Sequence, residues 1–138
     1  MQPNRRRILY VEDHEDTCEL ITLVLGQKNF EVTTERTIEK GVRLAREQSF
    51  DLYLLDSRLA DGSGLDLCKR IREFDRLTPI IFYSAAAFEL DKDMALNCGA
   101  QAYLIKPSHT WELCDLVCSL IEHGGNGQDK HVAILDGC

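Results

Sequence analysis

The stretches ILYVED at residues 8–13 and LYLLD at residues 52–56 decide the class of fold. Each is a short apolar run that ends in acidic residues. A run of this length that is apolar throughout is typical of a strand in a parallel sheet, because helices cover both faces of such a sheet. The two stretches therefore predict two central strands of an α/β protein, with carboxylates directly after both of them.

Three further short runs extend the pattern, at residues 30–35, 80–83 and 102–105. Apolar residues at helical spacing separate them. Five strands alternating with five helices predict a three-layer sandwich, with a parallel sheet between two layers of helices. Counted along the chain, the flavodoxin-like (βα)5 order 2-1-3-4-5 is the simplest right-handed topology. The run at residues 30–35 mixes polar and apolar residues and is expected at an edge of the sheet.

The chain of 138 residues suits a single domain. We expect this domain to occupy residues 1–123, because Gly124, Gly125 and Gly127 are poor helix residues and would end the last helix. Residues 124–138 are expected to be a C-terminal tail or the start of a linker, with a disordered end or an extra strand left open. Trp111 is expected to pack at the start of the last helix.

Charge and composition exclude several classes of protein. The net charge of −7 argues against direct nucleic-acid binding, which requires basic surface. No apolar stretch approaches the roughly 18 residues that span a bilayer, and no signal peptide opens the chain, so a cytoplasmic protein without membrane insertion is expected. The six cysteines include no Cys-x-x-Cys pair, which favours buried free thiols over a zinc or redox site.

Polar residues follow four of the five predicted strands. Glu12 and Asp13 follow the first, Asp56 the third, Ser84 the fourth and Lys106 the fifth. Ligands of an open parallel sheet bind outside the carboxyl ends of its strands, so we expect these side chains in one pocket. Three converging carboxylates call for a hard divalent cation, Mg²⁺ or Mn²⁺.

The same residues provide the groups needed for phosphoryl transfer. Asp56 can act as a nucleophile toward phosphorus, as the aspartate of aspartyl-phosphate enzymes does. Lys106 can neutralise the charge of a phosphoryl group, and Ser84 can donate a hydrogen bond to one of its oxygens.

Four segments resemble the receiver domains of two-component response regulators of the chemotaxis type. The resemblance covers residues 7–122. Residues 8–13 resemble the opening strand with its acidic pair, and residues 56–64 resemble the phosphoacceptor loop. Residues 79–85 resemble the fourth strand with its small hydroxyl residue, and residues 99–107 resemble the closing strand with its aromatic residue and Lys-Pro.

The resemblance implies a role for each site residue. Asp56 would take a phosphoryl group from a phosphohistidine on a sensor histidine kinase or a phosphotransfer protein. Asp13 and Asp56 would bind magnesium directly, Glu12 largely through water, and Arg58 through its backbone carbonyl.

Ser84 and Tyr103 would act as the switch that changes binding of an unknown downstream protein, and the Lys106-Pro107 bond is commonly cis in this family. Such a protein catalyses only its own phosphorylation and the hydrolysis of its acyl phosphate, so it is a signalling switch rather than an enzyme. The sequence departs from the family pattern at Ala60, where proline is usual, and at Ala102, which is often acidic in regulators that dimerise through this face.

Other interpretations remain for these residues. Asp13 could cap the first helix, and Tyr103 could be plain strand core. The chain could be a constitutive docking module that is never phosphorylated, although it keeps the acidic pair, the aspartate and the lysine. It could also be a phosphatase of the haloacid-dehalogenase type, but those enzymes carry a second aspartate two residues after the nucleophile, where this chain has Arg58.

Overall fold

The computed structural model describes residues 5–86, 89–107, 110–123 and 133–134. All five expected helices and all five expected strands are present. The helices are α1 (Glu15–Gly26), α2 (Ile38–Glu47), α3 (Gly64–Arg72), α4 (Glu89–Asn97) and α5 (Thr110–His123). The corresponding strands are β1 (Arg7–Val11), β2 (Glu31–Glu35), β3 (Leu52–Leu55), β6 (Ile80–Ser84) and β7 (Ala102–Ile105).

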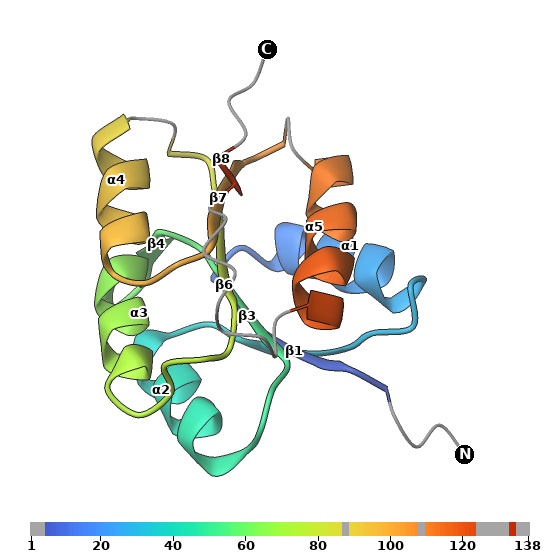
Figure 1. Cartoon of the computed structure of the whole chain (residues 1–138), viewed down its shortest axis with the longest axis horizontal. Coiled ribbons are helices and arrows are strands. Elements are labelled where there is room, and N and C mark those ends of the chain that lie inside the picture. Colours follow the sequence, from blue (N-terminus) through green and yellow to red (C-terminus); the bar gives the residue numbers. More distant parts are fainter. Residues whose placement is uncertain (1–4, 87–88, 108–109, 124–132, 135–138) are drawn as a thin grey trace.

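The main sheet is parallel and has the order β2-β1-β3-β6-β7-β8. Its first five strands have the predicted order, and β2 lies at the expected edge. The sixth, β8 (Ala133–Ile134), pairs with β7 at the opposite edge (Figure 1). An extra strand was one of the possibilities left open for the end of the chain.

Two short strands were not predicted. β4 (Arg58–Leu59) and β5 (Gly62–Ser63) form an antiparallel pair directly after the loop that carries Asp56. The turn between them places Gly62 at a φ of 145°, which only glycine adopts without strain.

Side chains alternate between the two faces of the sheet, as the pleat requires. Helices α2, α3 and α4 cover one face and α1 and α5 cover the other (Figure 1). In β1, Leu9 and Val11 face the first group of helices, whereas Ile8 and Tyr10 face the second. All four side chains are fully buried, which explains why this stretch is apolar throughout.

Several smaller expectations can also be compared with the structure. The five cysteines among the described residues are free thiols, and Cys138 lies outside these residues. The Lys106-Pro107 peptide bond is cis. Trp111 is 78% exposed at the start of α5, so the expectation that it packs there is wrong. Within the described ranges, no helix is long and apolar enough to cross a membrane.

Candidate functional site

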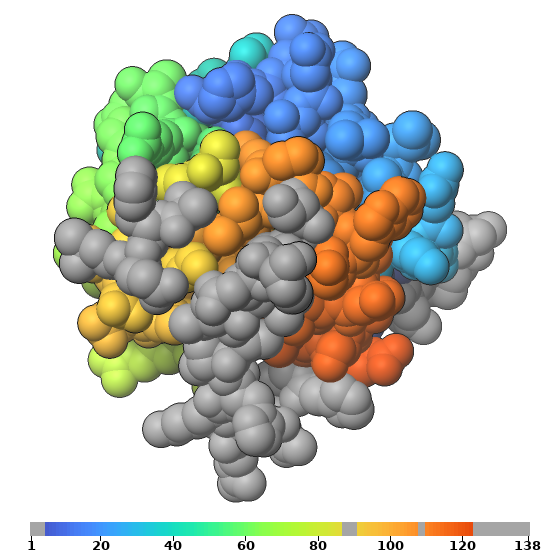
Figure 2. Space-filling view, turned by 90° about the horizontal axis from the view of Figure 1, so that it is seen from above, coloured from blue at the N-terminus to red at the C-terminus, as the bar shows by residue number. Residues whose placement is uncertain are grey.

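The site lies where the parallel strands of the main sheet end. Glu12 and Asp13 directly follow β1, Asp56 follows β3, Ser84 is the last residue of β6 and Lys106 follows β7. Figure 2 views this end of the molecule, where the blue N-terminal segment lies next to the yellow and orange segments around β6 and β7. The structure therefore brings together side chains that are up to 94 residues apart in the chain.

Glu12 is fully buried at the centre of this group. Its Oε1 atom accepts hydrogen bonds from Tyr10 Oη at 2.9 Å and from Lys106 Nζ at 2.5 Å. Burial alone would raise the pKa of the Glu12 carboxyl, but hydrogen bonds with Asp56 and Lys106 outweigh it and lower the pKa. The Glu12 carboxyl therefore ionises more readily than its burial alone would allow.

The pKa of Asp56 shifts in the opposite direction, although Asp56 lies beside Glu12. Burial, together with the neighbouring negative charge of Glu12, raises the pKa of Asp56 to about 6. Lys106 Nζ at 3.4 Å from Asp56 Oδ2, and a hydrogen bond from the Arg58 backbone, offset only part of this rise. A carboxylate under such repulsion gains from any cation that enters the group.

Asp13 supplies the observation that tests whether a cation fits. Its Oδ1 atom is buried and has no hydrogen-bond partner among the described residues. Atoms of Glu12, Asp13, His14 and Asp56 all lie within 4.8 Å of one another, as ligands of one metal ion would. A buried carboxylate oxygen without a partner is costly unless a cation completes its environment. The residues present therefore fit a divalent cation.

The helix-capping alternative for this segment does not hold. α1 starts at Glu15, and its N-cap residue is His14, whose side chain makes no capping hydrogen bond to the described backbone. The side chain of His14 is 72% exposed. However, its Nδ1 atom points at the acidic group. Its position directly after the acidic pair was the signal that could have revealed this.

Ser84 and Tyr103 belong to a connected set of polar atoms beside Asp56. Ser84 Oγ lies 2.5 Å from Ser57 Oγ and accepts a hydrogen bond from Ala86 N. Tyr103 is fully buried, stacks on Phe82, and donates a hydrogen bond from its hydroxyl to Ala86 O at 2.7 Å. Ser57 was missed by sequence reasoning, because a lone serine after an aspartate has no distinctive pattern.

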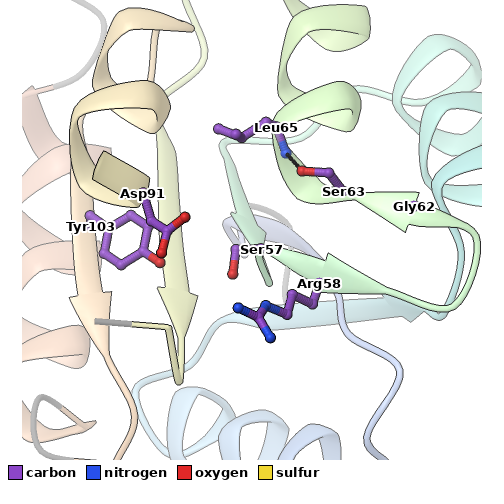
Figure 3. A pocket seen from close by; sticks show the side chains of 7 residues that line it. All are labelled: Ser57, Arg58, Gly62, Ser63, Leu65, Asp91 and Tyr103. Carbon is purple, nitrogen blue, oxygen red and sulfur yellow. Dashed lines mark hydrogen bonds between the residues drawn. The ribbon is translucent and has the colours of Figure 1, made fainter. Parts of the chain in front are cut away.

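A cavity of about 250 Å³ opens next to these residues (Figure 3). Ser57, Arg58 and Tyr103 line it, together with Asp91 from α4. The side chain of Arg58 is exposed, so the guanidinium stands at the surface while the backbone of the same residue contacts Asp56. The cavity gives a small molecule access to the segment that follows Asp56.

Gly64 supports the Asp56 loop from behind, which sequence reasoning did not detect. A Cβ atom added at this first residue of α3 would lie 2.0 Å from the backbone oxygen of Asp56. Ser57 O also accepts a hydrogen bond from Gly64 N at 2.9 Å. The absence of a side chain at Gly64 therefore lets the start of α3 pack directly against the phosphoacceptor loop identified by resemblance.

Comparison with known proteins agrees with this geometry. Residues 8–118 match the family model of the response regulator receiver domain. The response regulator ArlR of Staphylococcus epidermidis is 33% identical over 130 residues, which cover 94% of this chain and 58% of that protein. The response regulator protein PilR of Pseudomonas aeruginosa is 33% identical over 118 residues, or 86% of this chain and 26% of that protein. The chain thus spans about half the length of the ArlR relatives that it matches. It spans about a quarter of the length of PilR.

Solved structures show the same fold. The non-phosphorylated HemR receiver domain from Leptospira biflexa is 33% identical with a TM-score of 0.79, over 85% of this chain and 94% of that one. A two-component response regulator from Clostridium difficile is 28% identical with a TM-score of 0.82, over 88% and 99%. A CheY-like receiver from Methanospirillum hungatei, at 24% identity and a TM-score of 0.84 over 88% and 98%, supports the fold alone.

Proposed function

Because the chain belongs to the response regulator receiver domains of two-component systems, we propose that Asp56 is its phosphoacceptor. One observation carries the proposal. Asp56 is 4% exposed, and its carboxyl lies beside both the buried acid Glu12 and the ammonium of Lys106, at the strand ends. A carboxyl that is raised in pKa, yet placed beside a cation, is suited to accept a phosphoryl group rather than to serve as a turn residue.

The cation of the site is Mg²⁺ or Mn²⁺ in this proposal. Asp13 and Asp56 bind it directly, Glu12 binds it through water, and Arg58 contributes its backbone carbonyl. The unpartnered Asp13 Oδ1 and the close carboxylates support this set. When bound, the ion neutralises the negative charge that accumulates where a phosphoryl group approaches the carboxylates.

The transfer itself is a displacement at phosphorus. An oxygen of Asp56 forms a bond to the phosphorus of a phosphohistidine, the P–N bond breaks, and the imidazole nitrogen keeps the electron pair. Lys106 donates hydrogen bonds to the transferred group and offsets its charge. Hydrolysis ends the signal: a water oxygen attacks phosphorus, the P–O bond to Asp56 breaks, and phosphate leaves. The protein catalyses only these two steps, on itself.

The switch couples this chemistry to the surface. Ser84 Oγ leaves its contact with Ser57 Oγ and donates a hydrogen bond to the new phosphoryl group. That movement alters the bond from Ala86 N to Ser84, and Ala86 O is the acceptor for Tyr103. Tyr103 lies in β7 next to α4, so the surface formed by these two elements changes and with it the binding of a downstream protein.

Domain limits and partners complete the proposal. Residues 1–123 form the receiver, and residues 124–138 form a tail or the start of a linker that adds β8 to the edge of the sheet. Response regulators receive their phosphoryl group from histidine kinases. For this chain the donor is a sensor histidine kinase or a phosphotransfer protein, and the receiver makes no direct contact with nucleic acid.

Intact-mass spectrometry tests the assignment of Asp56. The full chain is incubated with magnesium and acetyl phosphate, a small covalent phosphodonor. A single magnesium-dependent phosphoryl adduct is expected in the unaltered chain and in the control Asp66→Asn, an exposed aspartate on α3. Asp56→Asn should take up none. Equal labelling of Asp56→Asn would refute the assignment, and a folded, magnesium-binding chain without any adduct would favour a constitutive docking module.

A further inference from the structure

His14 is a titratable side chain that the proposed function does not use. Its Nδ1 atom lies 3.1 Å from Glu12 Oε2 and 3.2 Å from Asp13 Oδ1. Its backbone N–H also donates a hydrogen bond to Glu12 Oε2 at 3.3 Å. One ring nitrogen is thus held between two carboxylates of the acidic group, while most of the ring faces solvent.

The two carboxylate oxygens of Glu12 have different partners. Oε1 is engaged by Tyr10 and Lys106, both toward the interior. Oε2 meets the exposed His14, whose Nδ1 atom also lies 3.2 Å from Asp13 Oδ1, an oxygen without a hydrogen bond among the described residues. A cation that completes the environment of Asp13 Oδ1 therefore enters on the same side as the imidazole.

The distances allow one ion to contact Asp13, His14 and Asp56 after small movements, with Glu12 close enough to hold a water bound to the ion. Ligands at about 2.1 Å from an octahedral ion lie at most about 4.2 Å apart. The ligand atoms of Glu12, Asp13, His14 and Asp56 lie within 4.8 Å of one another. The group needs to contract only slightly, and His14 is free to do so because its ring is exposed and caps no described helix N–H.

Imidazole changes which ions the site prefers. Magnesium favours oxygen ligands and binds nitrogen poorly, whereas imidazole suits later first-row divalent ions such as Ni²⁺ and Fe²⁺. We propose that His14 Nδ1 is an additional ligand of the cation site and shifts its preference from Mg²⁺ toward divalent transition-metal ions. This inference rests on the proposed cation site at Asp13 and Asp56, and adds to it a ligand that determines specificity.

Pulsed electron paramagnetic resonance on the full, tag-free chain loaded with Mn²⁺ gives a direct readout. An imidazole nitrogen bound to the ion produces a ¹⁴N hyperfine coupling. We expect this coupling in the unaltered chain and its loss in His14→Ala and His14→Gln. The control Glu15→Gln should retain it, because Glu15 is an exposed acid in the first turn of α1 and does not belong to the group.

Calorimetric titration with Mg²⁺ and Ni²⁺ tests specificity. His14→Ala should weaken Ni²⁺ binding at least about tenfold, since even indirect partners of a metal ligand contribute about 10- to 100-fold, and should change Mg²⁺ binding less than about twofold. Cys18→Ala controls for the nearby thiol, whose Sγ donates to the backbone oxygen of Glu12, and should leave the ratio of the two affinities unchanged.

The outcomes separate this inference from the function on which it rests. Absence of nitrogen coupling, or an unchanged ratio of Ni²⁺ to Mg²⁺ affinity in His14→Ala, overturns the role of His14. If Asp13→Asn still abolishes Mg²⁺ binding in that case, the cation site of the proposed function stands. A folded, unaltered chain that binds neither ion would overturn both.

Discussion

The ammonium of Lys106 lies 2.5 Å from Glu12 Oε1, which makes Glu12 its nearer carboxylate partner. Glu12 is fully buried, and the Lys106 side chain is 14% exposed. The pair joins the end of β1 to the end of β7, with β3 and β6 between them in the sheet. Lys106 thus has a structural role before any phosphoryl group arrives.

Lys106→Met should lower the free energy of unfolding by about 2–4 kcal/mol, because it leaves a buried carboxylate without its cation. Urea denaturation measures the loss. Lys69→Met, an exposed lysine on α3, is the control and should cost less than about 0.5 kcal/mol. Adding Glu12→Gln to Lys106→Met should restore part of the stability, and equal losses in the two lysine variants would contradict the pairing.

Asp56→Asn should stabilise the protein at neutral pH. The pKa of Asp56 rises from 3.8 to about 6 on folding, so the folded state binds this proton more tightly than the unfolded state. Stability is therefore lost as pH rises from about 4 to 6. The variant should gain about 1–3 kcal/mol above pH 6 and little below pH 4. Denaturation across this range measures the difference, and a gain independent of pH would speak against repulsion as its cause.

Asp75→Asn should show the opposite dependence on pH. Burial raises the pKa of Asp75, but hydrogen bonds from Thr78, Tyr53 and Leu77 outweigh it and lower the pKa. The carboxylate therefore stabilises the fold above the unfolded pKa, and this contribution is lost as pH falls through the folded value. The variant should cost about 1–2 kcal/mol at pH 7, and the cost should shrink in acid. A cost that grows in acid would be inconsistent with these bonds.

Gly64→Ala should destabilise the protein by more than about 3 kcal/mol, or prevent folding, because its Cβ would lie 2.0 Å from Asp56 O. Gly26→Ala is the matched control. Apart from its chain neighbours and the backbone of α1, no described atom lies within 4 Å of a Cβ at Gly26, so alanine there should stabilise the end of α1 by about 0.5–1 kcal/mol. Thermal unfolding compares the two, and a mild effect at Gly64 would show that the loop can move away.

Tyr103→Phe should remove the hydrogen bond to Ala86 O while leaving the stacking on Phe82 in place. The expected cost in stability is about 1 kcal/mol. Phosphoryl uptake from acetyl phosphate should stay near that of the unaltered chain, since the hydroxyl that is removed bonds to Ala86 O. The phosphorylation-dependent change in amide exchange near α4 should become smaller. A variant that lost phosphoryl uptake instead would place Tyr103 in the chemistry.

The order of the sheet, and the residues that gather at the ends of its strands, could be predicted from the sequence. Four buried strands appear as continuous apolar runs, and crossover rules leave few orders for them. Once β1, β3, β6 and β7 are parallel neighbours, the residues that follow them must meet. The prediction of a shared pocket for Glu12, Asp56 and Lys106 needed no information on side-chain direction.

The directions of side chains and the close approach of backbone segments could not be predicted from the sequence. The sequence pattern does not predict that Lys106 lies closer to Glu12 than to Asp56, or that His14 Nδ1 meets Glu12. It also does not predict that Gly64 packs against the Asp56 backbone. These features depend on rotamers and on differences of about an ångström. β8 was equally undetermined, because two residues are too few for an apolar period to define a strand.

The separation of β1 and β7 along the chain affects how the protein folds. An intermediate that has assembled β1, β2 and β3 already holds Glu12, Asp13 and Asp56 together, although Lys106 has not yet arrived. Mutual repulsion of the three carboxylates raises the free energy of such a half-formed sheet relative to both the unfolded chain and the finished one. The acidic group thus makes folding more nearly all-or-none, and a divalent cation present during synthesis would take the place of the missing ammonium.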